Sequence, residues 1–171
     1  MEQTNILSNK RRVLSIVWLC ALLVVITFAP LIGNQYITGT IVNASLLVSV
    51  IAFGFNSTLV LCFLPSLIAL ASGTLPIVMA PMVPFIILGN ILLVYSFSLL
   101  RKSNYWTGLL SASLLKFSLL FFASNVIIDL FIKKQVAAKI AVMMSYPQLV
   151  TALLGGIIAF FIISKLEERK S

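Results

Sequence analysis

Residues 76–100 read PIVMAPMVPFIILGNILLVYSFSLL, and no side chain in this run carries a charge. A helix needs about 20 apolar residues to cross the hydrocarbon core of a bilayer, so this run is long enough to span a membrane. The whole chain has the same character, since 61% of its 171 residues are hydrophobic, only 9% are charged, and the mean hydropathy is +1.15. A soluble domain contains roughly 25% charged residues. The composition therefore predicts an all-α membrane protein.

Further apolar runs lie on both sides of residues 76–100. They predict one integral membrane domain over residues 1–171, a bundle of six transmembrane helices at about 13–30, 40–55, 57–71, 76–100, 107–128 and 146–166. The runs 40–55 and 57–71 are short for a span, so four or five crossings remain an alternative. Three prolines in the first half of 76–100 would free backbone carbonyls there, which membrane proteins tolerate where the backbone lines a cavity.

The distribution of basic residues predicts the orientation in the membrane. Six spans place both termini on one side, together with Lys10, Arg11, Arg12, Arg101, Lys102, Lys165, Arg169 and Lys170. The opposite side receives only Lys133, Lys134 and Lys139. Because cytoplasmic segments are enriched in Lys and Arg, we expect both termini to be cytoplasmic. The net charge of +8 is thus explained by topology and contact with membrane lipid, and we expect no nucleic-acid partner.

Lys116 is the one charged residue in the middle of a predicted span. An ammonium at the bilayer centre costs about 2.5–3.5 kcal/mol on insertion scales, so it should face the bundle interior and meet a polar group. Counted along their helices, Asn90 and Lys116 lie at the same depth, which would allow a direct contact. Two interpretations remain open: a structural lysine that bonds to protein acceptors, and a counter-charge for a bound anionic solute.

Polar residues gather at the ends of the predicted helices that face away from the termini. Asn34 and Tyr36 lie in the first loop, Asn43 lies one turn into the run 40–55, and Asn125 and Gln148 lie near the second long loop. Together with Lys116 and Asn90, they predict a solute pocket that opens outward. One face of the last run has small and polar residues at helical spacing and is more typical of a packing seam than of a pocket wall: Gln148, Thr151, Ala152, Gly155 and Ala159.

The sequence contains few residues that could catalyse a reaction or bind a metal ion. The chain has no histidine, and its four acidic residues are scattered at Glu2, Asp129, Glu167 and Glu168. We therefore expect no catalytic residues, no metal site and no cofactor. Cys20 and Cys62 both lie in apolar runs and are interpreted as core residues. A Gly-rich phosphate loop that ends in Lys-Ser or Lys-Thr is also missing, so active transport would draw on a partner or on an ion gradient.

Residues 37–44 (ITGTIVNA) and 80–90 (APMVPFIILGN), together with Lys116, resemble the substrate-binding S components of energy-coupling factor (ECF) transporters. The resemblance covers about residues 13–166 and is strongest to a subgroup without an assigned substrate. It implies a subunit of a prokaryotic plasma membrane that binds a vitamin or similar micronutrient near the outer face. It also implies two kinds of partner, a membrane coupling subunit and cytoplasmic ATPase subunits. The chain departs from the family in the run 13–30, which lacks the Ala-x-x-x-Ala docking patch.

From this resemblance and the polar residues together, we expect a substrate-binding site formed by Lys116, Asn90, Asn43, Asn34, Tyr36, Asn125 and Gln148. Lys116 would favour a solute that carries a carboxylate, and Asn34 and Tyr36 would belong to the lid. Two alternatives stay open: a self-sufficient small secondary carrier or channel, and a membrane scaffold that transports nothing.

Overall fold

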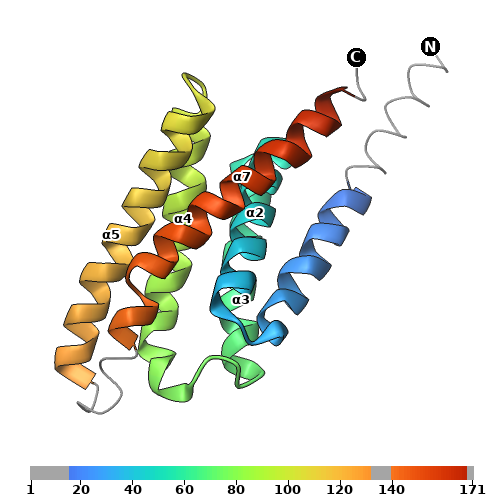
Figure 1. The fold of residues 1–171 in the computed structure, drawn as a ribbon. Coiled ribbons are helices and arrows are strands. Elements are labelled where there is room, and N and C mark those ends of the chain that lie inside the picture. Colours follow the sequence, from blue (N-terminus) through green and yellow to red (C-terminus); the bar gives the residue numbers. More distant parts are fainter. Residues whose placement is uncertain (1–15, 132–139, 169–171) are drawn as a thin grey trace.

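The computed structural model describes residues 16–131 and 140–168, which are helical and contain no strand (Figure 1). The helices are the N-terminal helix Ile16–Ile32, α2 (Gln35–Phe53), α3 (Phe55–Ala71), α4 (Val83–Leu100), α5 (Tyr105–Phe131) and α7 (Tyr146–Glu168). A 3-10 segment, η1 (Ala29–Ile32), ends the N-terminal helix, and another, η2 (Ile77–Met82), precedes α4. The predicted all-α class is confirmed. Several basic residues of the topology prediction lie outside the described residues: Lys10, Arg11, Arg12, Lys133, Lys134, Lys139, Arg169 and Lys170.

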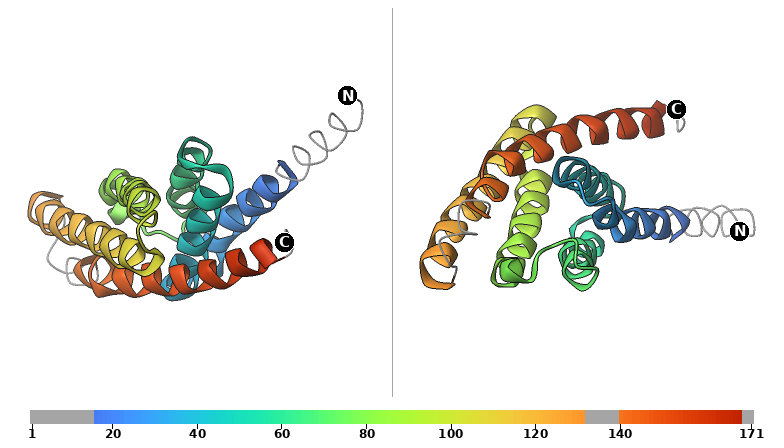
Figure 2. Two further views of the ribbon diagram at one scale, coloured as in Figure 1. Left: turned by 90° about the horizontal axis from the view of Figure 1, so that it is seen from above. Right: turned by 60° about the horizontal axis from the view of Figure 1, so that its bottom comes forward.

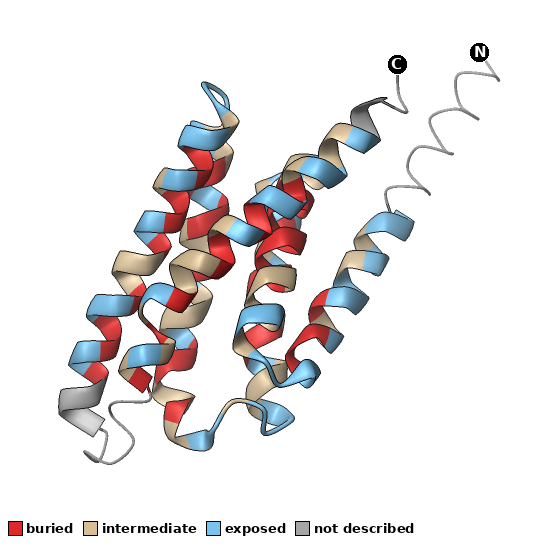
Figure 3. Cartoon of the chain, in the orientation of Figure 1, coloured by how far each residue is buried: buried red, intermediate tan, exposed pale blue. Residues whose placement is uncertain are grey.

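Four of these helical stretches are long and apolar enough to cross a membrane, namely Gln35–Phe53, Ile77–Leu100, Tyr105–Ile127 and Ile140–Lys165. Ile16–Ile32 and Phe55–Ala71 are apolar but shorter. The outward faces carry large apolar side chains, such as Phe122 and Phe161, which are 68% and 61% exposed (Figure 3). Many large apolar side chains are exposed in this way, and extensive exposed apolar surface marks an interaction site such as contact with a membrane. The fold is therefore a helix bundle in which four helical stretches have the length and composition to cross a membrane.

The first loop is shorter than the sequence predicts. Helix α2 begins at Gln35, where the prediction placed the start at about residue 40. The side chain of Asn34 accepts hydrogen bonds from the backbone N–H groups of Tyr36 and Ile37, at 3.0 and 3.2 Å, and so caps the helix. Gly33 supplies the preceding left-handed turn with φ +70°. The turn therefore ends at Asn34, and the extended α2 has the length of a span.

The predicted helix 76–100 is divided into two parts. Residues Ile77–Met82 form η2, and the α-helix starts only at Val83. Proline has no backbone N–H to donate, so it is tolerated at the first positions of a helix and disrupts a helix interior. Pro84 lies in the first turn of α4, and Pro81 lies inside η2. The prolines thus confine regular α-helix to the second part of this stretch.

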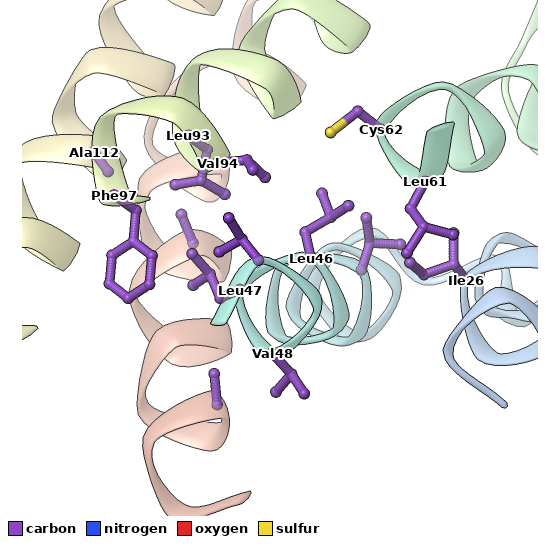
Figure 4. Close-up of a cluster of buried hydrophobic side chains, with 14 of the residues drawn as sticks. Ile26, Leu46, Leu47, Val48, Leu61, Cys62, Leu93, Val94, Phe97 and Ala112 are labelled. Carbon is purple, nitrogen blue, oxygen red and sulfur yellow. The ribbon is translucent and has the colours of Figure 1, made fainter. Parts of the chain in front are cut away.

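Helix α2 lies at the centre of the bundle and packs against α3, α4 and α7. Leu46 and Leu47 of α2 converge with Leu93, Val94 and Phe97 of α4 in the largest apolar cluster (Figure 4). Helix α5 and the N-terminal helix lie at opposite edges of the bundle in both views of Figure 2. The polar residues described below lie in the other half of the bundle, near the start of α2.

The contact of α7 with α2 depends on small residues. A Cβ atom added to Gly155 would lie only 2.8 Å from the backbone nitrogen of Ala44, and Ala152 and Ala159 are fully buried. Close approach of helix backbones through small residues is typical of membrane proteins, because packing replaces the hydrophobic effect there. The predicted packing seam on α7 is confirmed for these three positions.

Candidate functional site

Lys116 of α5 points into the bundle and is 3% exposed. Its Nζ donates one hydrogen bond to Oδ1 of Asn43 on α2, at 2.7 Å, and another to Oδ1 of Asn90 on α4, at 2.8 Å. The predicted contact between Lys116 and Asn90 is confirmed, and Asn43 adds a second acceptor. One buried ammonium therefore ties together three helices.

Both amides are held with their oxygen atoms toward Lys116. Nδ2 of Asn43 donates to Oγ1 of Thr151 on α7, at 3.4 Å, and Nδ2 of Asn90 donates to the backbone carbonyl of Cys62 on α3, at 3.2 Å. If either amide were turned over, it would present its NH2 group to an ammonium and lose both contacts. The polar network thus reaches α3 and α7 as well, and it orients two acceptors in advance.

The described hydrogen-bond partners of Lys116 and of its two amides are all neutral. Asn43 and Asn90 offer neutral amide oxygens to Lys116. An ammonium has three N–H donors, so two of them are used by these amides. A buried charge is costly when it is not compensated by an opposite charge. In the described contacts, the cation at this site is therefore held by neutral acceptors.

A cavity of about 180 Å³ extends from this network toward the end of the bundle where α2 and α7 begin. Lys116, Asn43, Asn90 and Thr151 line its deep part, which we call the floor. Apolar side chains line its wall: Val42, Pro65, Ala69, Leu75, Ile86, Met143 and Met144. A mostly apolar hollow with a few converging polar groups is the usual form of a small-molecule site.

Polar contacts link the two segments near the mouth of the cavity. Nε2 of Gln35 donates to the carbonyl of Met143 at 2.6 Å, and Nε2 of Gln148 donates to the same carbonyl at 3.2 Å. Both glutamines line the cavity. Hydrogen bonds thus connect the start of α2 with the segment before α7 beside the mouth of the cavity.

The structure brings together most of the predicted site residues. Lys116, Asn43, Asn90, Asn34 and Gln148 all line the cavity, although the carboxamide oxygen of Asn34 is engaged in capping α2.

Tyr36 and Asn125 lie elsewhere. Both are exposed and neither lines the cavity, and the hydroxyl of Tyr36 bonds instead to that of Tyr146 at 3.3 Å.

Sequence reasoning missed Ser66 of α3. This residue is 3% exposed and lines the cavity, and its hydroxyl has no hydrogen-bond partner among the described residues. Ser66 lies one turn beyond Cys62, whose carbonyl holds Asn90, so both occupy one face of α3. A serine inside an apolar run gives no signal of its own, but the i, i+4 spacing identifies it once that face is known.

Comparisons of this chain with protein-family models, with curated proteins and with solved structures give no match. The resemblance to ECF S components therefore stays a prediction from the residues quoted above.

Proposed function

We propose that this protein is the membrane-embedded, solute-binding subunit of an importer, and that it captures a small polar solute in the Lys116 cavity. The single observation that carries the proposal is the buried ammonium at the cavity floor, held by two neutral amides. A purely structural lysine needs acceptors but no hollow beside it. Here the ammonium lines a cavity of about 180 Å³. A solute with a negative charge would form an ion pair with this ammonium.

The proposal includes six crossings of the membrane. Helix α2 has 19 residues and α3 has 17, which correspond to about 28 and 25 Å at 1.5 Å per residue. The hydrocarbon core is about 30 Å thick, and local thinning of the bilayer accommodates a small deficit. An even number of crossings places the beginning and the end of the chain on the same side of the membrane, and the start of the N-terminal helix and the end of α7 lie at the same end of the bundle in Figure 1.

The basic residues support an outward-facing cavity. Arg101 and Lys102 lie in the connection after α4, and Lys165 lies near the end of α7. This end of the bundle is opposite to the end where α2 and α7 begin (Figure 1). If it faces the cytoplasm, as the enrichment of basic residues in cytoplasmic segments favours, the cavity faces outward. That orientation suits capture from outside the cell.

Energy for transport would come from partner subunits. The sequence has no phosphate-binding Gly-rich loop, so a membrane coupling subunit and cytoplasmic ATPase subunits, as in ECF transporters, would drive release into the cell. The chain would then act in a prokaryotic plasma membrane. Recovery of such subunits with the tagged protein under mild solubilisation is the expected result. Uptake of solute by the lone protein in proteoliposomes under an ion gradient would favour a secondary carrier instead.

The direct test is to identify the small molecules that the purified protein retains. We expect mass spectrometry to find a solute bound to the natural protein and to a Lys102→Ala control, in which a lysine far from the cavity is lost. Lys116→Ala should be inserted and monodisperse but retain at least tenfold less of it, because the opposite charge is gone. Equal retention by Lys116→Ala and Lys102→Ala would refute the proposed role of Lys116.

A further inference from the structure

Building on the proposed function, we infer that the cavity selects a compact solute with a single negative charge, of the size of one aromatic ring, and that the Ser66 hydroxyl assists Lys116 in binding the anionic group. The inference rests on the size of the cavity, on the charges of its described lining, and on two polar lining residues, Lys116 and Ser66, that have hydrogen-bonding capacity left.

The size of the cavity limits the part of the solute that is enclosed. An apolar cavity of about 150 Å³ accepts benzene. A cavity of about 180 Å³ therefore has room for one six-membered ring with a small substituent. The wall suits a ring, since Val42, Ile86 and Met144 present apolar surface. A larger solute would have to extend through the mouth, past Gln35 and Gln148.

The charges in the lining limit the charge of the solute. Among the described residues that line the cavity, Lys116 is the only charged one, and the other polar members are neutral amides and hydroxyls. A single negative charge matches this lining. A dianion would bring a second charge into an apolar wall without a partner, and a cation would face Lys116 directly. Both should bind poorly even when their shape is suitable.

The remaining hydrogen-bonding capacity favours a carboxylate at the floor. Asn43 and Asn90 use two of the three N–H donors of Lys116 and direct their own NH2 groups to Thr151 and to the carbonyl of Cys62. One carboxylate oxygen can thus accept from Lys116, and the second needs another donor. Ser66 supplies one, since it lines the cavity and its buried hydroxyl is unpaired among the described residues.

The inference can be tested with benzene derivatives whose substituents differ in charge. The full chain in lipid nanodiscs would be titrated calorimetrically with benzoate, benzamide, benzylamine and terephthalate, with empty nanodiscs as the background. We expect benzoate to bind at least tenfold more tightly than the neutral, cationic and dianionic compounds. Equal affinity for benzamide or terephthalate would overturn the charge selection.

Two buried serines provide a matched pair of variants. Ser113 on α5 is fully buried and its hydroxyl is also unpaired among the described residues, but it does not line the cavity. Ser66→Ala should weaken benzoate binding about tenfold, because a hydrogen bond to a charged group is lost, while Ser113→Ala should change it less than twofold. Equal effects of the two variants would overturn the role of Ser66.

Failure of this inference is distinguishable from failure of the proposed function. If none of the four ring compounds binds, the size and charge class is wrong. A solute found by mass spectrometry, and lost in Lys116→Ala, would still support solute capture in that case.

Discussion

The two halves of the bundle are built from the same helices but differ in what fills them. In the half toward the connection after α4, Phe97 of α4 is fully buried and its ring meets Tyr105 of α5 edge to face, with centroids 5.2 Å apart. We call this the packed half. In the half toward the start of α2, which we call the hollow half, the corresponding space is the cavity. Lys116 lies between the two. The packed half holds the helices in place, and so the hollow half can keep an open site.

The first way to sharpen this comparison is to remove a large side chain from the packed half. Phe97→Ala leaves a void of roughly 100 Å³, which at about 24 cal/mol per Å³ lowers the free energy of unfolding by about 2 kcal/mol or more. Solute affinity of the folded protein should change little, since Phe97 does not line the cavity. Unfolding in mixed micelles followed by circular dichroism, together with a solute titration, measures both.

Phe122→Ala is the matched control for this variant. Phe122 lies on the outward face of α5 and is 68% exposed, so lipid replaces the lost side chain and stability should fall by less than about 1 kcal/mol. Similar losses for Phe97→Ala and Phe122→Ala would mean that the packed half does not hold the bundle together.

The second test adds a negative charge to the protein itself, next to Lys116 in the hollow half. Asn43→Asp places a carboxylate beside Nζ of Lys116, at the position of an oxygen now 2.7 Å away. The protein then completes its own ion pair, and an anionic solute should bind tenfold or more weakly while the fold is kept. Titration of the purified variant with the solute identified by mass spectrometry gives the result.

Asn34→Asp is the control for the added charge. Asn34 also lines the cavity, but an aspartate there still caps α2, and the described hydrogen bonds of Asn34 do not involve Lys116 or its two amides. Its effect should be less than threefold. If Asn43→Asp bound the solute as well as the natural protein, charge compensation at the floor would not be the basis of binding.

The smallest effect is expected at the surface of the hollow half. Tyr36→Phe removes the exposed hydrogen bond to Tyr146, and the Tyr36 side chain does not line the cavity. Solute affinity should therefore change less than twofold, within the range of a peripheral polar contact. A tenfold loss would restore the lid role that the sequence predicted for this residue and would extend the site beyond the cavity wall.

The sequence predicted the features that follow from the cost of polarity in a membrane. Lys116 had to face the interior, and its equal depth with Asn90 correctly predicted their contact. The fold class and the bounds of α3 and α7 followed from apolar runs bounded by polar residues. These predictions succeeded because each depends on the sequence of one helix, or on two residues that lie at the same depth in two helices.

Features that depend on neighbouring helices could not be predicted in this way. The predicted helix start at about residue 40 left Gly39 in the first loop, yet Gly39 lies inside α2, where an added Cβ would come 3.0 Å from the side chain of Thr151 on α7. Gly39 allows α2 and α7 to pack closely. The sequence of α2 alone does not show that another helix comes so near. Ser66 became a candidate only when α3 was seen to carry the carbonyl that holds Asn90.

The most direct test of the account is a density map of the protein in a lipid nanodisc with its retained solute. The account predicts density in the cavity, with the anionic group of the solute within hydrogen-bonding distance of Nζ of Lys116 and with both amide oxygens still on that atom. A solute bound elsewhere, or a collapsed interior with Lys116 turned to lipid, would contradict it.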